Sequence, residues 1–280
     1  MHLIVTVDTE ADDQWNEQAG VSVENVYALP RFQTLCEKYG MVPTYLVTYE
    51  VAADPKAVEM LKGWQDTGKA EVGAHLHPWT TTPLAEGEGS TRMFPSQLRD
   101  DALRAKFTNL TEMLGRAFGR QPTSYRAGRW GFDSRQVALL AEFGYLVDSS
   151  VTPSLSWARL RGPDFTKEGL APHALSSRVL EVPMTILRAG LFSRVRWLRI
   201  FERTTKRQLA SVVAGAQSLS LPAIVFMIHS SELVAGKSPY VRDEAALARV
   251  YTHLESLFVL CKERGIIAAT LSDFTRGFHA

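Results

Sequence analysis

Short apolar runs alternate with segments of helical periodicity along the chain. The runs are rich in β-branched residues, as expected for buried strands, and fall at residues 3–10, 43–48, 70–75, 124–126, 145–148, 179–182, 223–229 and 266–270. Between them, apolar spacing and Pro and Gly punctuation predict helices at residues 30–40, 55–68, 98–114, 135–143, 209–216 and 243–264. Residues 150–178 show no clear period.

This alternation predicts a parallel sheet, because parallel neighbours need crossover connections and the intervening helices supply them. No internal repeat or Gly/Ser linker interrupts the pattern, so we expect one domain spanning residues 1–280. The length fits a closed or distorted (β/α) barrel of seven or eight strands, with an open doubly wound sheet as the alternative.

Composition indicates a globular protein without a strongly charged partner. The 280 residues are 45% hydrophobic and carry a formal net charge of +1, which gives no general reason to expect nucleic acid binding. Met1 leads directly into strand residues without a signal-peptide pattern, and no segment has the roughly 20 apolar residues needed to span a bilayer. We therefore expect a cytoplasmic protein, in which the widely separated Cys36 and Cys261 are reduced.

Five polar residues stand at the carboxyl ends of predicted strands: Asp8, His75, Arg126, Asp148 and His229. Any one of them has a structural explanation, such as a core histidine, an ion-pair partner or a helix cap. All five together favour function, because βα enzymes of both architectures assemble their sites at this edge.

Two of these strand ends carry pairs of potential metal ligands. Side chains alternate along a strand, so Asp8 and Glu10 point to the same side if the strand continues to Glu10. His75 and His77 repeat this spacing at the end of another strand. Paired carboxylates and paired imidazoles together suggest a metal site.

Five motifs, in order, resemble those of the polysaccharide deacetylases that carry the chitooligosaccharide deacetylase homology domain (carbohydrate esterase family 4). They occupy residues 6–10, 71–78, 125–131, 147–150 and 228–233. Each departs from the family pattern: the second acid is displaced by one and enlarged to Glu, the two His are closer together, and Gly replaces Pro after the arginine. The short His-x-His spacing requires a different loop at that strand end.

The resemblance extends over most of the chain and implies a distorted (β/α) barrel and a divalent-metal hydrolase. An amide resists neutral water, so a hydrolase needs a cation that polarises the carbonyl and lowers the pKa of water. Imidazole and carboxylate suit Zn²⁺, and three protein ligands leave a position open. Glu10, His75 and His77 are the preferred ligand set, although the sequence leaves open whether Asp8 or Glu10 is the ligand.

The remaining polar residues take roles in proton transfer. Asp8 would act as the base, held ionised by Arg126, and His229 would protonate the leaving amine from the opposite side. Asp148 would orient one of the imidazoles without itself binding the metal. Ser230 and Ser231 beside His229 lack the Gly-x-Ser-x-Gly turn of a serine hydrolase.

The substrate expected from the resemblance is an acetylated amino sugar or glycan. Trp15, Trp79 and Trp130 follow site strands and could stack on sugar rings; the alternative is that they brace the loops. Hydrolysis of a C–N bond outside carbohydrates, or glycan binding without catalysis, are the competing functions.

Residues 188–207 carry seven basic residues and a single acid. On a helix, one face would carry Arg196, Arg199, Arg203 and Arg207, and such a segment could lie on an anionic membrane. A helix that packs on the sheet with solvated arginines is the alternative.

Overall fold

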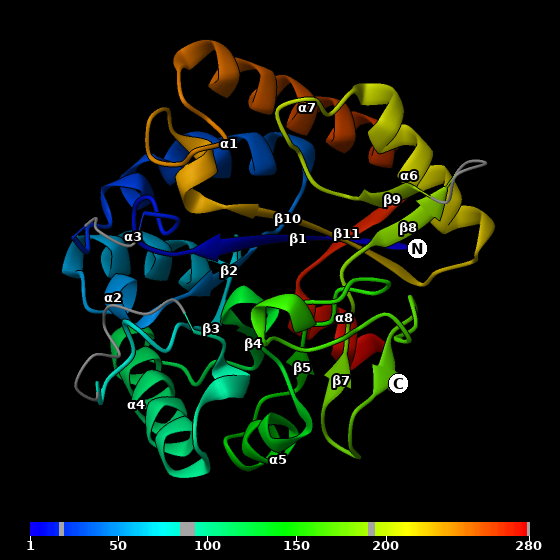
Figure 1. The fold of residues 1–280 in the computed structure, drawn as a ribbon. Helices are drawn as coiled ribbons and strands as arrows, with labels where there is room; N and C mark the ends of the chain where they lie inside the picture. Colours follow the sequence, from blue (N-terminus) through cyan, green and yellow to red (C-terminus); the bar gives the residue numbers. More distant parts are fainter. Residues whose placement is uncertain (17–19, 85–92, 190–193, 279–280) are drawn as a thin grey trace.

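Eight parallel strands form a curled sheet in the computed structural model, which describes residues 1–16, 20–84, 93–189 and 194–278 (Figure 1). Seven strands follow one another across the sheet in the order β10 (Ala223–His229), β1 (His2–Thr9), β2 (Thr44–Val47), β3 (Glu71–Leu76), β4 (Ser124–Ala127), β5 (Val147–Asp148) and β7 (Leu180–Glu181). A short antiparallel strand, β6 (His173–Ala174), borders β7. The sheet is a half-barrel, which confirms the predicted distorted barrel of seven or eight parallel strands.

Strand β1 pairs with three other strands of this sheet. It pairs with β10 from His2 to Asp8, so that Asp8 lies opposite His229. On its other side, β2 pairs with its carboxyl half and β11 (Ile267–Ala269) with its amino half. Residues 3–10 are all buried, as the run of β-branched and apolar residues predicts for a strand covered on both faces.

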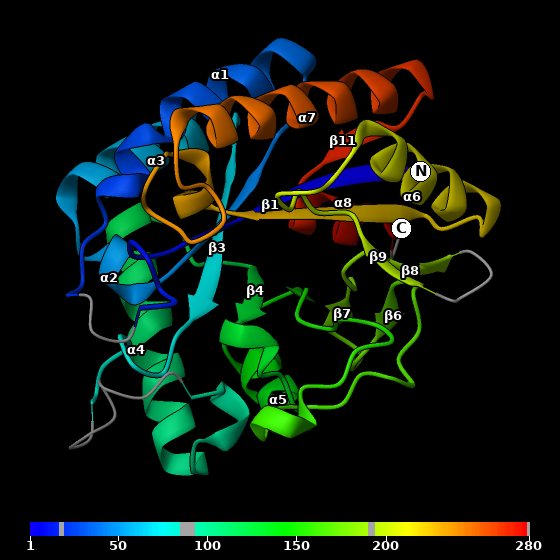
Figure 2. The same ribbon diagram turned by 45° about the horizontal axis from the view of Figure 1, so that its top comes forward.

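Six long helices cover the sheet at the predicted positions. They are α1 (Leu29–Tyr39), α3 (Pro55–Asp66), α4 (Asp100–Phe118), α5 (Ser134–Glu142), α6 (Lys206–Ser218) and α7 (Glu244–Glu263). Figures 1 and 2 show α1 and α7 side by side on one flank of the sheet, and α4 and α5 on the other. The helix ends follow the sequence signals: Asp54 caps α3 by accepting from the Ala57 N–H, and Gly40 ends α1 in the left-handed conformation.

Shorter helices join these elements. They are η1 (Glu24–Ala28), α2 (Tyr49–Ala52), η3 (Pro95–Gln97), η4 (Gly128–Trp130), η5 (Ala158–Leu160), η6 (Ser230–Leu233) and α8 (Leu271–Phe278). Across the described ranges, no helix combines the length and the apolar character that a membrane span requires.

The basic segment 188–207 is not a helix, so the hypothesis of a basic amphipathic helix is wrong. It contains the end of β8 (Ile186–Ala189) and all of β9 (Arg194–Trp197), an antiparallel hairpin, and then reaches the start of α6; residues 190–193 lie outside the described residues. Ile186 is fully buried at the start of the hairpin. Arg196 and Arg199 therefore do not share a solvent face: Arg196 donates to Ser211 of α6, whereas Arg199 is buried.

The segment before this hairpin connects the two sides of the half-barrel. The Thr185 hydroxyl accepts a hydrogen bond from the Val225 N–H of β10 at 2.8 Å. The Thr185 carbonyl accepts from the Leu198 N–H, just beyond β9, at 2.9 Å. The residues after β7 thus contact β10 directly, and the carboxyl ends of the strands face one shared cavity.

Candidate active site

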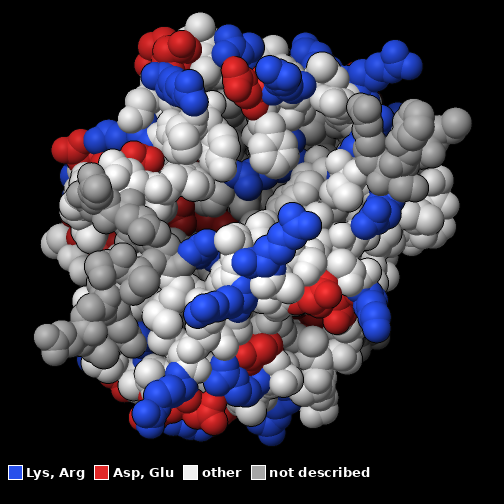
Figure 3. Space-filling model, in the orientation of Figure 1, with Lys and Arg blue, Asp and Glu red and all other residues white. Residues whose placement is uncertain are grey.

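Three of the five predicted strand-end residues, Asp8, His75 and His229, line one cavity of about 340 Å³. Asp8 and Glu10 line it together, as strand alternation predicts, and His77 lines it beside His75 and His229. Parallel strands bring their carboxyl ends to the same edge, which is why residues more than 200 positions apart meet here. Figure 3 shows the hollow near the middle of this face, with acidic atoms in its wall.

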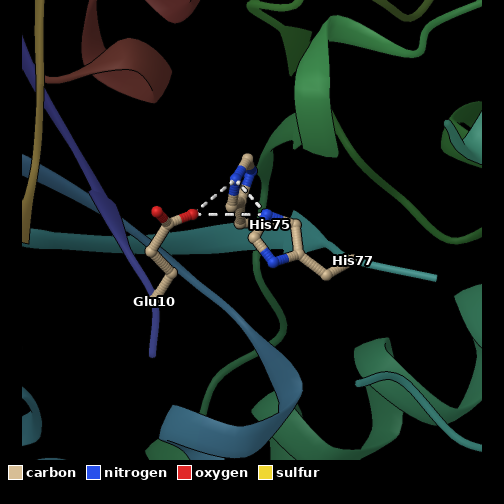
Figure 4. A group of neighbouring side chains, drawn as sticks. All are labelled: Glu10, His75 and His77. Carbon is tan, nitrogen blue, oxygen red and sulfur yellow. Dashed lines mark hydrogen bonds and ion pairs between the residues drawn. The ribbon is translucent and has the colours of Figure 1, made fainter. Parts of the chain in front are cut away.

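Glu10, His75 and His77 form a group that fits a metal ion (Figure 4). The two Nε2 atoms are 3.0 Å apart, and Glu10 Oε2 lies 3.3 Å from the Nε2 of His77 and 3.7 Å from that of His75. Zinc bonds of about 2.0–2.1 Å at tetrahedral angles place donor atoms roughly 3.3 Å apart. The spacing and the chemistry of these three donors therefore suit a tetrahedral cation with one position left open.

Two contacts orient the histidines for this role. His75 Nδ1 lies 2.9 Å from the Arg126 carbonyl, which can only accept, so His75 carries its proton on Nδ1 and presents the Nε2 lone pair to Glu10 and His77. His77 is stacked on Trp79, with ring centroids 4.2 Å apart, and Trp79 Nε1 donates to Gln14. The rings of His75 and His77 are thus each held by a residue that is not one of the three potential ligands.

The short His-x-His motif can place both imidazoles at the site because a glycine after β4 makes room for the second ring. His75 is the last residue but one of β3, and His77, two residues on, lines the same cavity. Its ring lies against Gly128, where a Cβ atom would come within 2.5 Å of His77 Cδ2 and of the Leu76 carbonyl oxygen. Only glycine leaves room for the His77 ring at this position.

Asp8 and Arg126 form a buried ion pair beside the metal-ligand group. Arg126 Nη1 donates to Asp8 Oδ1 at 2.5 Å, while its Nε donates to the Ser149 carbonyl. Burial alone would raise the pKa of Asp8, but Arg126 and His75 hold it below its usual range. Asp8 is therefore ionised, with Oδ2 4.0 Å from His75 Nε2.

On the paired strand β10, His229 is held by two residues that sequence reasoning did not assign. Glu232 accepts from the His229 backbone N–H at 2.9 Å and lies 3.1 Å from Nδ1. Arg199 donates to the other Glu232 oxygen at 2.9 Å. In the sequence, only the spacing of three residues between His229 and Glu232 could have indicated their contact. Nothing in the sequence connects Arg199 to Glu232.

These charges set the protonation of the group. Burial lowers the pKa of His229, but the carboxylates of Glu10 and Glu232 outweigh it and raise that pKa above the usual value. Burial likewise opposes ionisation of Glu232, yet Arg199 and His229 lower its pKa to about 2. The raised pKa favours the protonated imidazole of His229, whose Nε2 lies 3.9 Å from Glu10 Oε1.

Asp148 stands at its predicted strand end but contacts no imidazole among the described residues. It accepts from the Ser150 hydroxyl at 2.6 Å and interacts with Glu181. Burial, and then repulsion from Asp148, raise the pKa of Glu181 well above its usual value, which favours the protonated form of Glu181. The orienting contacts expected of Asp148 come instead from the Arg126 carbonyl for His75 and from Glu232 for His229.

The backbone after β4 is strained where it enters the cavity. Arg129 and Trp130 have φ values of 53° and 64°, a left-handed conformation that costs non-glycine residues about 1–3 kcal/mol each. Both side chains line the cavity. Strain of this kind is kept where the surrounding structure holds a side chain in a required place.

The three tryptophans that the sequence suggested as sugar contacts differ in how much of each side chain is exposed. Trp79 and Trp130 line it but are 4% and 8% exposed, and one face of Trp79 is covered by His77. Trp15 is 38% exposed and packs edge-to-face on both His229 and Tyr240. Trp15 and Tyr240 therefore offer the more open aromatic surface to a ligand.

Comparison with known proteins identifies the fold. No protein-family profile matches the sequence, and no curated protein sequence matches it. Solved structures do match across nearly the whole chain. A Mycobacterium smegmatis protein described as a candidate polysaccharide deacetylase has a TM-score of 0.65 at 15% identity, covering 99% of this chain and 90% of that one.

Two further structures extend this likeness. The allantoinase PuuE has a TM-score of 0.61 at 12% identity, covering 99% of this chain and 90% of its own. The Bc1960 peptidoglycan N-acetylglucosamine deacetylase has a TM-score of 0.55 at 13% identity, covering 98% and 87%. Family 4 carbohydrate esterases also match, among them one solved with a cobalt ion and one described as a pseudoenzyme.

The chain thus has the fold of the polysaccharide deacetylases and family 4 carbohydrate esterases. The resemblance expected from the five motifs is confirmed at the level of the fold. At these identities the likeness extends to architecture alone, and the chemistry of the site has to be argued from its own residues.

Proposed function

We propose that this protein is a metal-dependent hydrolase that removes an acetyl group from an N-acetylated sugar or glycan. The observation that carries the proposal is the Glu10, His75 and His77 group, whose three donor atoms have the spacing of a tetrahedral metal site. Imidazole and carboxylate donors favour Zn²⁺. A divalent cation held there would polarise the acyl carbonyl and make water a stronger nucleophile near neutral pH.

The proposed proton transfers use Asp8 and His229, which lie side by side on the paired strands β1 and β10. Asp8, kept ionised by Arg126, accepts the proton of the attacking water. His229, whose protonated form the Glu232 carboxylate stabilises from 3.1 Å, donates a proton to the amine nitrogen as the C–N bond breaks. Because environment pushes the two pKa values in opposite directions, base and acid have their working protonation states at the same pH.

A second candidate is hydrolysis of a C–N bond outside carbohydrates. The likeness to an allantoinase favours it, since that protein shares the fold over 99% of this chain. A glycan-binding protein without catalysis is less favoured, because the base, the acid and the three potential ligands all line one cavity.

The decisive experiment measures metal content and product together. Purified protein should contain about one divalent metal ion per chain and release acetate from an N-acetylated oligosaccharide. Chelation should abolish the release, and Zn²⁺ should restore it. Asp8→Asn should keep the metal and lose turnover, whereas Asp66→Asn, a control at an exposed helix end, should behave as wild type. Turnover of allantoin without acetate release would instead favour the second candidate.

A further inference from the structure

Glu10 stands just beyond the part of its strand that the sheet fixes. The pairing of β1 with β10 ends at Asp8, and its pairing with β2 ends at Thr9. The Glu10 carboxylate nevertheless has a defined place, because its Oε2 lies 3.3 Å from the Nε2 of His77 and 3.7 Å from that of His75 (Figure 4). Contacts other than the strand pairing therefore hold the backbone of Glu10.

Two buried side chains, far apart in the chain, make these contacts. Asn25 of η1 donates from Nδ2 to the Glu10 carbonyl at 2.9 Å. Ser230, the first residue of η6, accepts from the Glu10 N–H at 3.2 Å. Asn25 and Ser230 are both 0% exposed, so these hydrogen bonds lie in the protein interior, where they are stronger than in water.

The amide of Asn25 is oriented for donation alone. Its Nδ2 also donates to Asp12 Oδ1 at 2.7 Å, whereas its own Oδ1 is buried without a hydrogen-bond partner among the described residues. Buried acceptors are normally satisfied. Turning the amide over would direct Oδ1 at two other acceptors, the Glu10 carbonyl and the Asp12 carboxylate. The fold thus leaves one buried acceptor unpaired while both donors of Asn25 are used.

Asp12 is held in turn by two other segments. Its Oδ1 also accepts from the Asn25 backbone N–H at 2.9 Å. Its Oδ2 accepts from the Ser22 hydroxyl at 2.8 Å and from Lys237 Nζ at 2.9 Å. Lys237 Nζ donates as well to Glu24, the neighbour of Asn25, at 2.6 Å. Asp12 and Lys237 therefore fix Asn25 between the segments that follow β1 and β10.

We propose that Asn25 is a positioning residue for the proposed metal site. Its amide, fixed by Asp12 and Lys237, sets the backbone of Glu10 so that the carboxylate meets the two imidazoles. Asn25, Asp12 and Lys237 are not among the described residues that line the cavity, so they act through Glu10 and not on the substrate. The inference rests on the metal site of the proposed function and names the residues outside the cavity on which its affinity depends.

The affinity for Zn²⁺ in Asn25→Leu tests this role. Leucine has a similar volume and removes both donors of the amide. The Kd for Zn²⁺, measured by competition with a chromophoric chelator, should rise about 10- to 100-fold, as is typical when a group that orients a metal ligand is lost. Gln65→Leu is the matched control: it removes a buried amide that donates to the Phe118 carbonyl at 3.1 Å, where α3 and α4 end. It should lower the melting temperature and leave the Kd unchanged.

Lys237→Met tests the same connection without altering a fully buried residue. It removes the charge that binds Asp12 and should also raise the Kd for Zn²⁺. Combined with Asn25→Leu, it should raise the Kd by less than the product of the two separate effects, because both changes act through one contact with Glu10. Lys38→Met, which removes an exposed ion pair with Glu255, is its control and should leave the Kd unchanged. If Asn25→Leu does not fold, Lys237→Met decides, and a wild-type Kd in that variant overturns the inference.

The outcomes separate the positioning role from the chemistry. A folded Asn25→Leu protein with the wild-type Kd, or an equal rise of the Kd in Gln65→Leu, overturns the positioning role and leaves the proposed hydrolysis standing. Zn²⁺ binding that depends on Asn25 in a protein that releases no acetate supports the positioning role while the proposed reaction fails. A wild-type protein that does not bind Zn²⁺ overturns both.

Discussion

Replacing Glu232 with glutamine tests how the protein keeps His229 protonated. Glu232 Oε2 lies 3.1 Å from His229 Nδ1, and Glu10 Oε1 lies 3.9 Å from Nε2. A cation bound by Glu10 would cancel the effect of that carboxylate on His229. Glu232 would then be the main negative charge that stabilises the imidazolium, opposed by Arg199 on the same side.

The size of the effect follows from the pKa values. The pKa of Glu232 falls from 4.5 to about 2, which corresponds to about 3 kcal/mol in favour of its charged form, shared between Arg199 and His229. A charge partner at this range alters a pKa by about 1–3. A general acid works only while protonated, so activity is lost as pH rises through the pKa of His229. Glu232→Gln should therefore move the basic limb of the kcat profile about 1–3 pH units lower.

The assay is acetate release measured between about pH 5 and 10, with metal content checked at each pH. Glu202→Gln, which removes an exposed carboxylate near Arg199 in sequence, is the matched control and should leave the profile unchanged. Glu232→Gln should also destabilise the fold by about 3–5 kcal/mol, because Arg199 keeps a buried charge without its partner. A folded, metal-loaded Glu232→Gln enzyme with an unshifted basic limb would refute this account of His229.

Four other predictions concern the metal group and the stability of the fold. His77→Ala should lose metal and turnover together, because two remaining donors make an inadequate site; a metal-replete, active variant would contradict the ligand assignment. Asp8→Asn should keep the metal and lose about 10²- to 10⁴-fold in kcat, whereas loss of metal would exchange the roles of Asp8 and Glu10. Gly128→Ala should weaken metal affinity, measured by chelator competition, because its Cβ meets the His77 ring at 2.5 Å; unchanged affinity would mean that the strands shift freely. The depressed pKa of Glu232 contributes stability that is present above pH 4.5 and is lost as pH falls towards about 2, so acid titration of wild type should lose more stability in this window than Glu232→Gln does.

The order of strands and helices could be predicted because it depends on local signals. Apolar runs of three to eight residues, separated by segments with helical spacing, can be recognised without knowledge of the partner strands. The same signals place Asp8, His75, Arg126, Asp148 and His229 at strand ends, and the topology of a parallel sheet brings such ends to one edge. The pair spacing of Glu10 with Asp8 and of His77 with His75 indicated the metal group for the same reason.

Two features escaped sequence reasoning because their causes lie far away in the chain. The segment with Arg196 and Arg199 has a charge pattern that suits a helix, but it forms a hairpin whose first strand is buried against the half-barrel. Asp148 was expected to orient an imidazole, yet the register of β5 and β7 places it beside Glu181. Pairing partners and burial overrode the local pattern in both cases.

The sequence by itself determined which residue types stand at the carboxyl ends of the strands, since period and punctuation are properties of neighbouring residues. Tertiary structure alone decided what those residues touch. It made Glu232 and Arg199 the partners of His229, and it let the ring of His77 into the space that Gly128 leaves open. The physical reason is that protonation state and metal geometry depend on distances of 3–4 Å across segments that the chain keeps far apart, and only the packing of strands and loops sets those distances.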